Sequence, residues 1–173
     1  MDKYEKLLAP VAFSLNPITP VHWADLGCGT GVFTKVLADF LPPNSRITAI
    51  DSNRQHLPTV MGNGVGVTFQ KNNFETGELL LPPLDGILMA NAFHFVQSKE
   101  ALILRLEKYF HSNPVFLMVE YEHSRPNAWE PFPIPFQQMK ALFRKLNYKI
   151  IEKIGQQESV YGGMMYACLI SKN

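Results

Sequence analysis

The sequence has only two cysteines and a net charge close to zero, and each feature argues against a class of protein. The two cysteines, Cys28 and Cys168, lack the spacing of metal ligands. We therefore expect no metal site and two reduced thiols, as in a reducing compartment. The formal net charge is only +1 and the basic residues are dispersed. This balance argues against nucleic acid or an anionic membrane surface as a partner.

Long hydrophobic runs are also missing. No apolar stretch approaches the length of a membrane span, and the N-terminal residues lack the apolar segment of a secretory signal. We therefore expect a cytoplasmic protein that does not enter a membrane. The apolar fraction of 46% and the charged fraction of 18% are typical of a globular protein. The length of 173 residues fits one domain, residues 1–173, and no repeat is visible.

Three of the eleven glycines stand at alternate positions in one informative stretch. An apolar run over residues 21–26 leads into DLGCGTG at residues 25–31, and residues 32–41 are apolar at helical spacing. This order predicts a strand at about 21–26, a tight loop, and a helix at about 30–41. A glycine loop that opens a helix directs backbone N–H groups and the positive helix end toward one point. The stretch therefore indicates a nucleotide-type cofactor.

The glycine pattern lacks the third position of G-x-G-x-x-G, the fingerprint of nicotinamide and flavin sites. Gly31 comes one residue early, and Val32 stands where that fingerprint requires glycine. As it stands, DLGCGTG resembles motif I of the class I S-adenosylmethionine (SAM) dependent methyltransferases. The resemblance implies that SAM is the cofactor and that the loop contacts it through Asp25, Gly27, Cys28, Gly29 and Gly31. The alternative is a glycine-rich turn without a ligand.

A second predicted strand, residues 46–51, ends in Asp51, twenty residues beyond Gly31. A carboxylate at the end of a second parallel strand can accept both ribose hydroxyls, and the resemblance gives Asp51 that role, with Ser52 beside it. The alternative is a helix N-cap, because residues 52–62 have the pattern of a short helix interrupted by Pro58.

Asn73 and Phe74 follow a third predicted strand, residues 67–72. The family usually has Asp at the position of Asn73, where it accepts a hydrogen bond from the adenine amino group. Asn73 departs from that pattern, but its amide oxygen is still an acceptor. Phe74 is expected to flank the adenine, although a core aromatic is an equal alternative.

A fourth predicted strand, residues 85–91, continues into AFHFV and resembles the family's fourth motif. Its end lies next to that of the first strand, at the topological switch point where ligands bind. We expect Asn91 and Ala92 to face the methionine half of SAM and its methyl group. His94 is expected to line the methyl-transfer site. The alternatives are a strand-end turn for Asn91 and a capping or packing role for His94.

The loop over residues 121–136 follows a nearly continuous apolar strand, residues 115–121. Four prolines and three large aromatics lie between Pro126 and Phe136, which excludes helix there. We expect this loop to form a wall of the substrate pocket, with contacts from Tyr121, Arg125, Trp129 and Phe132. Otherwise it is a crossover whose aromatics cover the sheet edge.

The remaining segments complete the expected fold. Helices are predicted over residues 3–13, 99–110 and 137–147, with residues 1–20 forming a short N-terminal cap. Strands over 148–154 and 164–170, joined by a turn at 155–158, form an antiparallel hairpin. The resemblance implies an α/β, Rossmann-like, doubly wound sheet of seven strands. It is mostly parallel, with an antiparallel strand 7 and the order 3-2-1-4-5-7-6.

The resemblance implies methyl transfer from SAM. The neutral charge and the aromatic loop favour a small-molecule acceptor, and both monomer and homodimer remain open. An oxygen or nitrogen nucleophile can require a general base, for which His94, Glu122 and His123 are candidates near strand ends. A carbon, thiolate or carboxylate nucleophile would need none. The alternatives are a SAM-binding regulatory protein without transfer activity, a NAD-dependent oxidoreductase, which the glycine spacing disfavours, and an aminopropyl transferase, which Asn91 disfavours.

Overall fold

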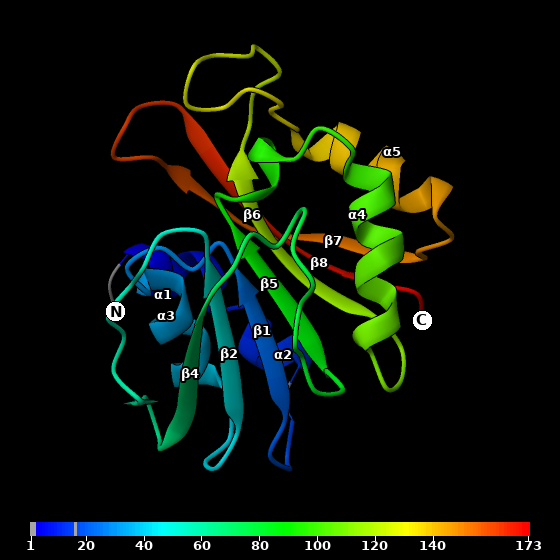
Figure 1. The fold of residues 1–173 in the computed structure, drawn as a ribbon. Helices are drawn as coiled ribbons and strands as arrows, with labels where there is room; N and C mark the ends of the chain where they lie inside the picture. The colour runs from blue at the N-terminus through cyan, green and yellow to red at the C-terminus, as the bar shows by residue number, and fades with distance from the viewer. Residues whose placement is uncertain (1–2, 16) are drawn as a thin grey trace.

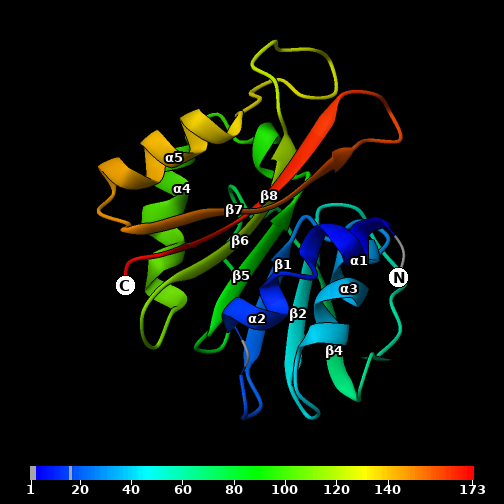
Figure 2. The same cartoon turned by 180° about the vertical axis from the view of Figure 1, so that it is seen from behind.

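An eight-stranded sheet with helices on both faces forms the body of the molecule (Figures 1 and 2). The structure, a computed structural model, describes residues 3–15 and 17–173. The strands are β1 (His22–Leu26), β2 (Arg46–Asp51), β3 (Val60–Met61), β4 (Val65–Lys71), β5 (Gly86–Ala90), β6 (Val115–Tyr121), β7 (Ile150–Glu158) and β8 (Met164–Ser171).

The strand order is β3-β4-β2-β1-β5-β6-β8-β7. Without β3 it matches the predicted order strand for strand, so the predicted fold class is confirmed. β4, β2, β1, β5 and β6 pair in parallel, while β8 runs antiparallel between β6 and β7. β3 is an additional two-residue edge strand, antiparallel to β4.

Two predicted elements do not form, and a third, the N-terminal helix, is interrupted. Residues 52–62 form no helix but an irregular segment that ends in β3. Pro58 lacks a backbone N–H, and Asp51 Oδ1 instead accepts the N–H of Asn53 at 2.8 Å, which turns the chain directly after β2. The predicted turn at 155–158 belongs to β7, and the chain turns at residues 159–163. Gly155 lies against α1, where a Cβ would be 2.3 Å from the Leu7 carbonyl oxygen.

The helices are α1 (Lys3–Leu8), α2 (Val11–Leu15), α3 (Val32–Phe40), η1 (Phe93–Phe95), α4 (Lys99–Leu106), η2 (Glu107–Tyr109) and α5 (Phe136–Lys145). The helix predicted over residues 3–13 is broken in two at Pro10, whose ring is incompatible with a helix interior. Residues 1, 2 and 16 of the predicted cap segment lie outside the described residues. α1 packs against α3, β7 and β8, on one face of the sheet.

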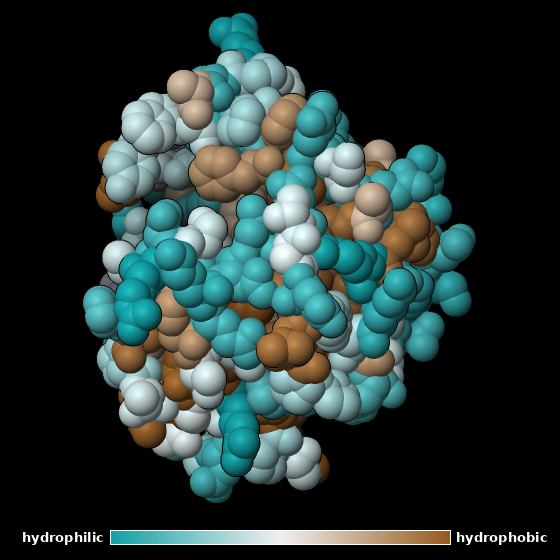
Figure 3. Space-filling view, viewed as in Figure 1, coloured by the Kyte–Doolittle hydropathy of each residue, from teal (hydrophilic) through white to brown (hydrophobic). Residues whose placement is uncertain are grey.

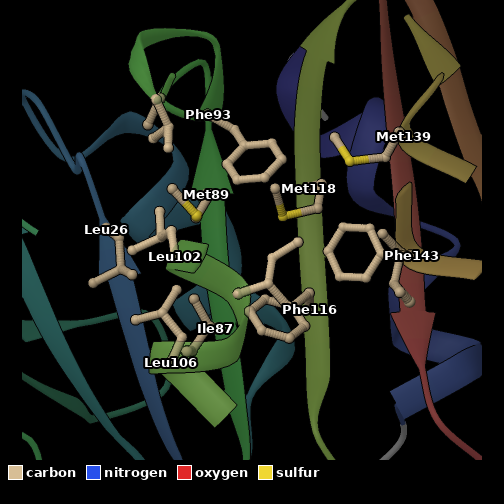
Figure 4. Packing of buried hydrophobic residues seen from close by; sticks show 14 of the residues in the cluster. Leu26, Ile87, Met89, Phe93, Leu102, Leu106, Phe116, Met118, Met139 and Phe143 are labelled. Carbon is tan, nitrogen blue, oxygen red and sulfur yellow. The ribbon is translucent and has the colours of Figure 1, made fainter. Parts of the chain in front are cut away.

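The strands bury both faces, because helices cover each side. α1, α2 and α3 lie on one face, and α4 and α5 lie on the other (Figures 1 and 2). Residues of β6 alternate between them: Phe116 and Met118 pack with the α4–α5 side, and Leu117 and Val119 pack with the α1–α3 side. Figure 4 shows the first of these layers. Burying each such side chain contributes roughly 1.5–3 kcal/mol, which explains the nearly continuous apolar strands.

The parallel strands bring their carboxyl ends to one edge, the upper edge in Figure 1. β1 and β5 are neighbours at the point where the chain order reverses, since β2 and β4 lie on one side and β6 on the other. Ligands of open α/β sheets bind at such a switch point. In the described part of the chain, no helix has the length and hydrophobicity to cross a membrane. On the face in Figure 3, hydrophobic residues form separate patches among hydrophilic ones.

Candidate active site

The loop between β1 and α3 contains three glycines that cannot be replaced without backbone strain. Gly27, Gly29 and Gly31 have φ values of 81°, 49° and 85°, in the region that disfavours other residues. A Cβ on Gly27 would lie 2.6 Å from the Ala92 Cβ. Open space surrounds the corresponding position at Gly29, where a ligand can approach the chain. The predicted glycine loop therefore has the form of a cradle.

Asp51, at the end of β2, holds this loop in place. Its Oδ2 accepts the backbone N–H of Gly29 at 2.9 Å, and its Oδ1 accepts that of Asn53 at 2.8 Å. Each carboxylate oxygen can accept a second hydrogen bond. Asp51 can therefore keep these bonds and still receive hydroxyl donors from a ligand.

Asn73 organises the loop after β4. Its Oδ1 accepts the N–H groups of Glu75 and Thr76 at 2.9 and 3.2 Å. Arg105 of α4 holds the same loop by donating to the carbonyls of Phe74 and Gly77. The amide oxygen that was predicted to meet adenine thus already stabilises a turn, a geometry that Asp or Asn can both provide.

A cleft of about 470 Å³ lies between these loops. Eight of the predicted cofactor residues line it: Gly27, Gly29, Asp51, Ser52, Asn73, Phe74, Asn91 and Ala92. The lining also includes Asn53, Glu75 and Phe95, which were not predicted. Each of these three stands within four residues of a predicted residue on the same loop, so extending each motif along its loop would have found them.

Asp25, Cys28 and Gly31, all in the described chain, lie outside the lining. Asp25 is 1% exposed, and its Oδ2 accepts the Thr34 hydroxyl at 2.6 Å. Burial raises the pKa of Asp25 to about 7, the Thr34 bond opposes this, and the charge of Asp51 adds to it. Burial also raises the pKa of the Cys28 thiol, so Cys28 is not a reactive thiolate.

Asn91 stands at the switch point with an unusual backbone. Its φ is 52°, its N–H donates to the Val119 carbonyl at 2.9 Å, and it follows directly on β5. Its Oδ1 is buried, and within residues 3–15 and 17–173 it has no hydrogen-bond partner. An unsatisfied buried acceptor costs about 1–3 kcal/mol. A ligand donor would remove that cost.

A second cleft, of about 760 Å³, adjoins the first and shares Asn91 and Phe95 with it. The rest of its lining comes from η1, the end of β6, the loop after β6 and the β7–β8 turn: His94, Tyr121, Asn127, Trp129, Glu130 and Tyr161. Tyr121 and Trp129 were predicted as substrate contacts. Asn127 and Glu130 lie in the predicted substrate loop but were not singled out, and nothing local in the sequence links Tyr161 to the site.

Two predicted substrate residues lie outside this lining. Phe132 anchors the loop, since its N–H donates to the His94 carbonyl at 2.9 Å and its carbonyl accepts Lys99 Nζ at 2.7 Å. Burial lowers the pKa of Lys99 to about 8, while Glu120 and Glu75 act in the opposite direction. Arg125 is exposed on the same loop.

His94 is held by a residue that the sequence pattern did not reveal. Its Nδ1 is 2.8 Å from Glu120 Oε2, and both side chains are buried. Glu120 Oε1 also accepts the N–H groups of Phe93 and His94, at 2.8 and 3.1 Å. Glu120 lies inside the apolar run of β6, and a lone acid in such a run was the available signal. The arrangement orients the imidazole beside the second cleft.

The other two candidate bases have different partners. Glu122 accepts the Phe136 N–H at 2.9 Å and pairs with Lys153 Nζ at 2.6 Å, so both its oxygens serve the structure around α5 and β7. His123 Nε2 pairs with Glu130. Only His94 of the three candidates lines the second cleft, in the described chain.

Comparison with known proteins places this geometry in context. Residues 24–109 match a family described as "Methyltransferase domain". No curated protein matches the chain significantly. The matched segment runs from β1 to η2, so it contains the glycine loop, Asp51, Asn91 and His94.

Solved structures share the fold across nearly the whole chain. A Burkholderia thailandensis 1,6-didemethyltoxoflavin-N1-methyltransferase, with that compound and S-adenosylhomocysteine bound, is 17% identical, with a TM-score of 0.69 over 98% of this chain and 78% of its own. A SAM-dependent methyltransferase from Aquifex aeolicus is 13% identical, with a TM-score of 0.67 over 99% and 94%. A magnesium protoporphyrin IX methyltransferase from Synechocystis PCC 6803, with SAM bound, is 10% identical, with a TM-score of 0.65 over 98% and 80%. At these identities the likeness shows a common fold.

Proposed function

Since this chain belongs to the methyltransferase-domain family, we propose that it transfers a methyl group from SAM to a small-molecule acceptor, with His94 as the proton acceptor. The observation that carries the proposal is the pair of adjoining clefts, which meet at Asn91 and Phe95. A donor in one cleft and an acceptor in the other would meet at this junction. Two of the neighbours, named for 1,6-didemethyltoxoflavin and magnesium protoporphyrin IX, support a small acceptor.

The residues of the first cleft fit SAM. The glycine loop leaves its backbone open at Gly29, Asp51 retains acceptor capacity for ribose hydroxyls, and Asn91 Oδ1 lacks a donor among the described residues. Ser52 and Phe74 also line this cleft, where they would contact the ribose and the adenine. When bound, SAM supplies a methyl group activated by a sulfonium centre, so the protein mainly aligns the reactants and excludes water.

The tautomer of His94 would make the ring nitrogen Nε2 the proton acceptor. An ionised carboxylate can only accept hydrogen bonds, so Glu120 requires the proton on His94 Nδ1. In the neutral ring, Nε2 is then left as the acceptor for the cleft that His94 lines. An acceptor hydroxyl or N–H in that cleft can pass its proton to Nε2, and the resulting imidazolium is stabilised by Glu120. Glu120 is a positioning residue.

Calorimetry tests the first cleft. SAM and S-adenosylhomocysteine should bind, NAD should not, and Asp51→Ala should weaken both nucleosides at least tenfold. Asp39→Ala is the matched control, because Asp39 is a surface carboxylate paired with Lys35 on α3. Tighter binding of NAD than of SAM would contradict the proposal.

Methyl transfer tests the second cleft. SAM with a labelled methyl group is incubated with fractionated small-molecule cell extract, and label should appear in one fraction with the native protein and fall sharply with His94→Asn. SAM binding without transfer to any fraction would favour the alternative, a regulatory SAM-binding protein.

A further inference from the structure

Several aromatic side chains that line the second cleft are exposed to solvent instead of packing in the hydrophobic core. Trp129 and Tyr161 line it, yet they are 82% and 88% exposed. Phe95 lies at its junction with the first cleft and is also exposed. Large exposed aromatics that surround one concavity mark a binding site, because isolated ones would not converge.

The two most exposed rings are presented by ordered turns. Asn127 Oδ1 accepts the N–H groups of Trp129 and Glu130 at 2.8 and 2.9 Å, which shapes the turn that carries the indole. Ser159 Oγ accepts the Tyr161 N–H at 3.1 Å in the β7–β8 turn. The two turns come from separate parts of the chain and both rise above the same sheet edge (Figures 1 and 2). They therefore place two rings beside one cavity.

The lining also contains rings that pack around His94. The His94 ring centroid lies 4.4 Å from that of Phe95 and 5.9 Å from that of Tyr121. The His94 imidazole is thus flanked by two further rings from η1 and the end of β6. A flat ring system in this cavity could therefore contact several aromatic side chains of the lining.

The cavity offers no counter-charge to an anion. Among the described residues of its lining there is neither Lys nor Arg, and Glu130 is paired with His123. Burial raises the pKa of Tyr121, so this phenol remains neutral. A carboxylated or phosphorylated ligand would lose hydration without gaining a partner.

We infer that this cavity takes a planar, uncharged aromatic acceptor with a ring hydroxyl or ring N–H, and that Trp129 and Tyr161 contact its ring system. The inference rests on the proposed function, because it names the acceptor class of the same site. His94 accounts for the hydroxyl or N–H, since a neutral imidazole Nε2 can accept its proton. The aromatic lining accounts for planarity, and the lack of cations in the described lining accounts for the absence of charge on the acceptor.

Calorimetry with three matched probes tests the inference. 2-Naphthol is planar and neutral, 2-naphthoate is planar and anionic, and 2-decalol is neutral and saturated. Each is titrated into the protein saturated with S-adenosylhomocysteine. 2-Naphthol should bind at least tenfold more tightly than the other two. Trp129→Ala and Tyr161→Ala should each weaken 2-naphthol by about three- to tenfold, the usual range for an aromatic contact.

Leu80→Ala is the matched control, because Leu80 is 75% exposed and lies outside the cavity lining. All three side chains are largely exposed, so folding should be unaffected. The inference would be overturned by equal affinity for 2-naphthol and 2-decalol, by tighter binding of 2-naphthoate, by unchanged affinity in both aromatic variants, or by no binding of 2-naphthol at its solubility limit. Failure of S-adenosylhomocysteine to bind would instead overturn the proposed function, and the two results are separately measured.

Discussion

Replacing Glu120 by Gln should reverse the tautomer of His94 while leaving the fold in place. The Glu120→Gln variant keeps an oxygen that can accept the N–H groups of Phe93 and His94, as Glu120 Oε1 does. The amide nitrogen then takes the place of Oε2, which lies 2.8 Å from His94 Nδ1. An amide N–H₂ can only donate, so Nδ1 must become the acceptor and the proton must move to Nε2.

The size of the effect follows from these contacts. Hydrogen bonds to a charged group contribute about 1 kcal/mol more than neutral ones, so weakening the two backbone bonds to Glu120 costs at most about 2 kcal/mol. Relief of the buried carboxylate's desolvation offsets part of this. For a chain of this size the Tm should therefore fall by less than about 8 °C. Turnover should fall about 10²- to 10⁴-fold, the usual contribution of a general base.

The tautomer can be measured without knowing the acceptor. Long-range ¹H–¹⁵N correlation spectra distinguish protonated from unprotonated ring nitrogens, and His94→Asn identifies the signals of His94 among the five histidines. In alkaline buffer, where an imidazole is neutral, the native protein should carry the proton on Nδ1 and Glu120→Gln should carry it on Nε2. Glu130→Gln is the matched control, since Glu130 pairs with the more exposed His123.

The same His94 tautomer in the native protein and in Glu120→Gln would refute this reasoning. So would a change of equal size in Glu130→Gln, because that carboxylate pairs with His123 instead of His94. A large loss of thermal stability without a tautomer change would show that Glu120 serves only the packing of η1 against β6.

Three further predictions concern the glycine loop, the buried Asp25 and the partly buried Lys99. Gly27→Ala should abolish S-adenosylhomocysteine binding in calorimetry, because φ is 81° and the new Cβ would lie 2.6 Å from that of Ala92. Retained affinity would contradict the proposal that the glycine loop binds the cofactor. Asp25 has a folded pKa of about 7, raised from 3.8, so its contribution to stability is full below about pH 4 and lost as the pH rises through 7. Urea midpoints of Asp25→Asn should lack this decline, and a parallel decline in both proteins would count against it. Lys99 has a folded pKa of about 8, lowered from 10.5, so stability should rise between pH 8 and 10.5, and Lys99→Met should show no such rise in the same assay.

Short-range pattern predicted most of the residues that line the first cleft. The glycine spacing, Asp51 at a strand end and Asn91 after an apolar run are local features, and parallel strands bring such ends to one edge. Predictions of secondary structure from local pattern were wrong at two places, where a specific contact favoured a different backbone conformation. The pattern of residues 52–62 predicts a helix, but Asp51 caps a turn there and Pro58 cannot donate a helical hydrogen bond. Gly155 predicts a turn, but it lies within β7, where the absence of a side chain allows α1 to pack closely.

Glu120 and Tyr161 could be placed beside the second cleft only from the three-dimensional structure. Glu120 is separated from Phe93 by 27 residues, and its partners become visible only when the end of β6 lies beside the segment after β5. Tyr161 reaches the cavity because β8 inserts between β6 and β7 and carries the turn above the sheet edge.

The fold class and the glycine loop could be predicted from the sequence alone, because both depend on periodicity and on residues close together in the chain. The three-dimensional structure was needed to show that, among the described residues, His94 is the candidate base that lines the second cleft and Trp129 is the aromatic of the proline-rich segment that does so. These depend on contacts between distant segments, which no local pattern records. A strand end fixes the position of the residue that follows it, whereas the side chains of a loop are positioned by contacts with segments far away in the sequence.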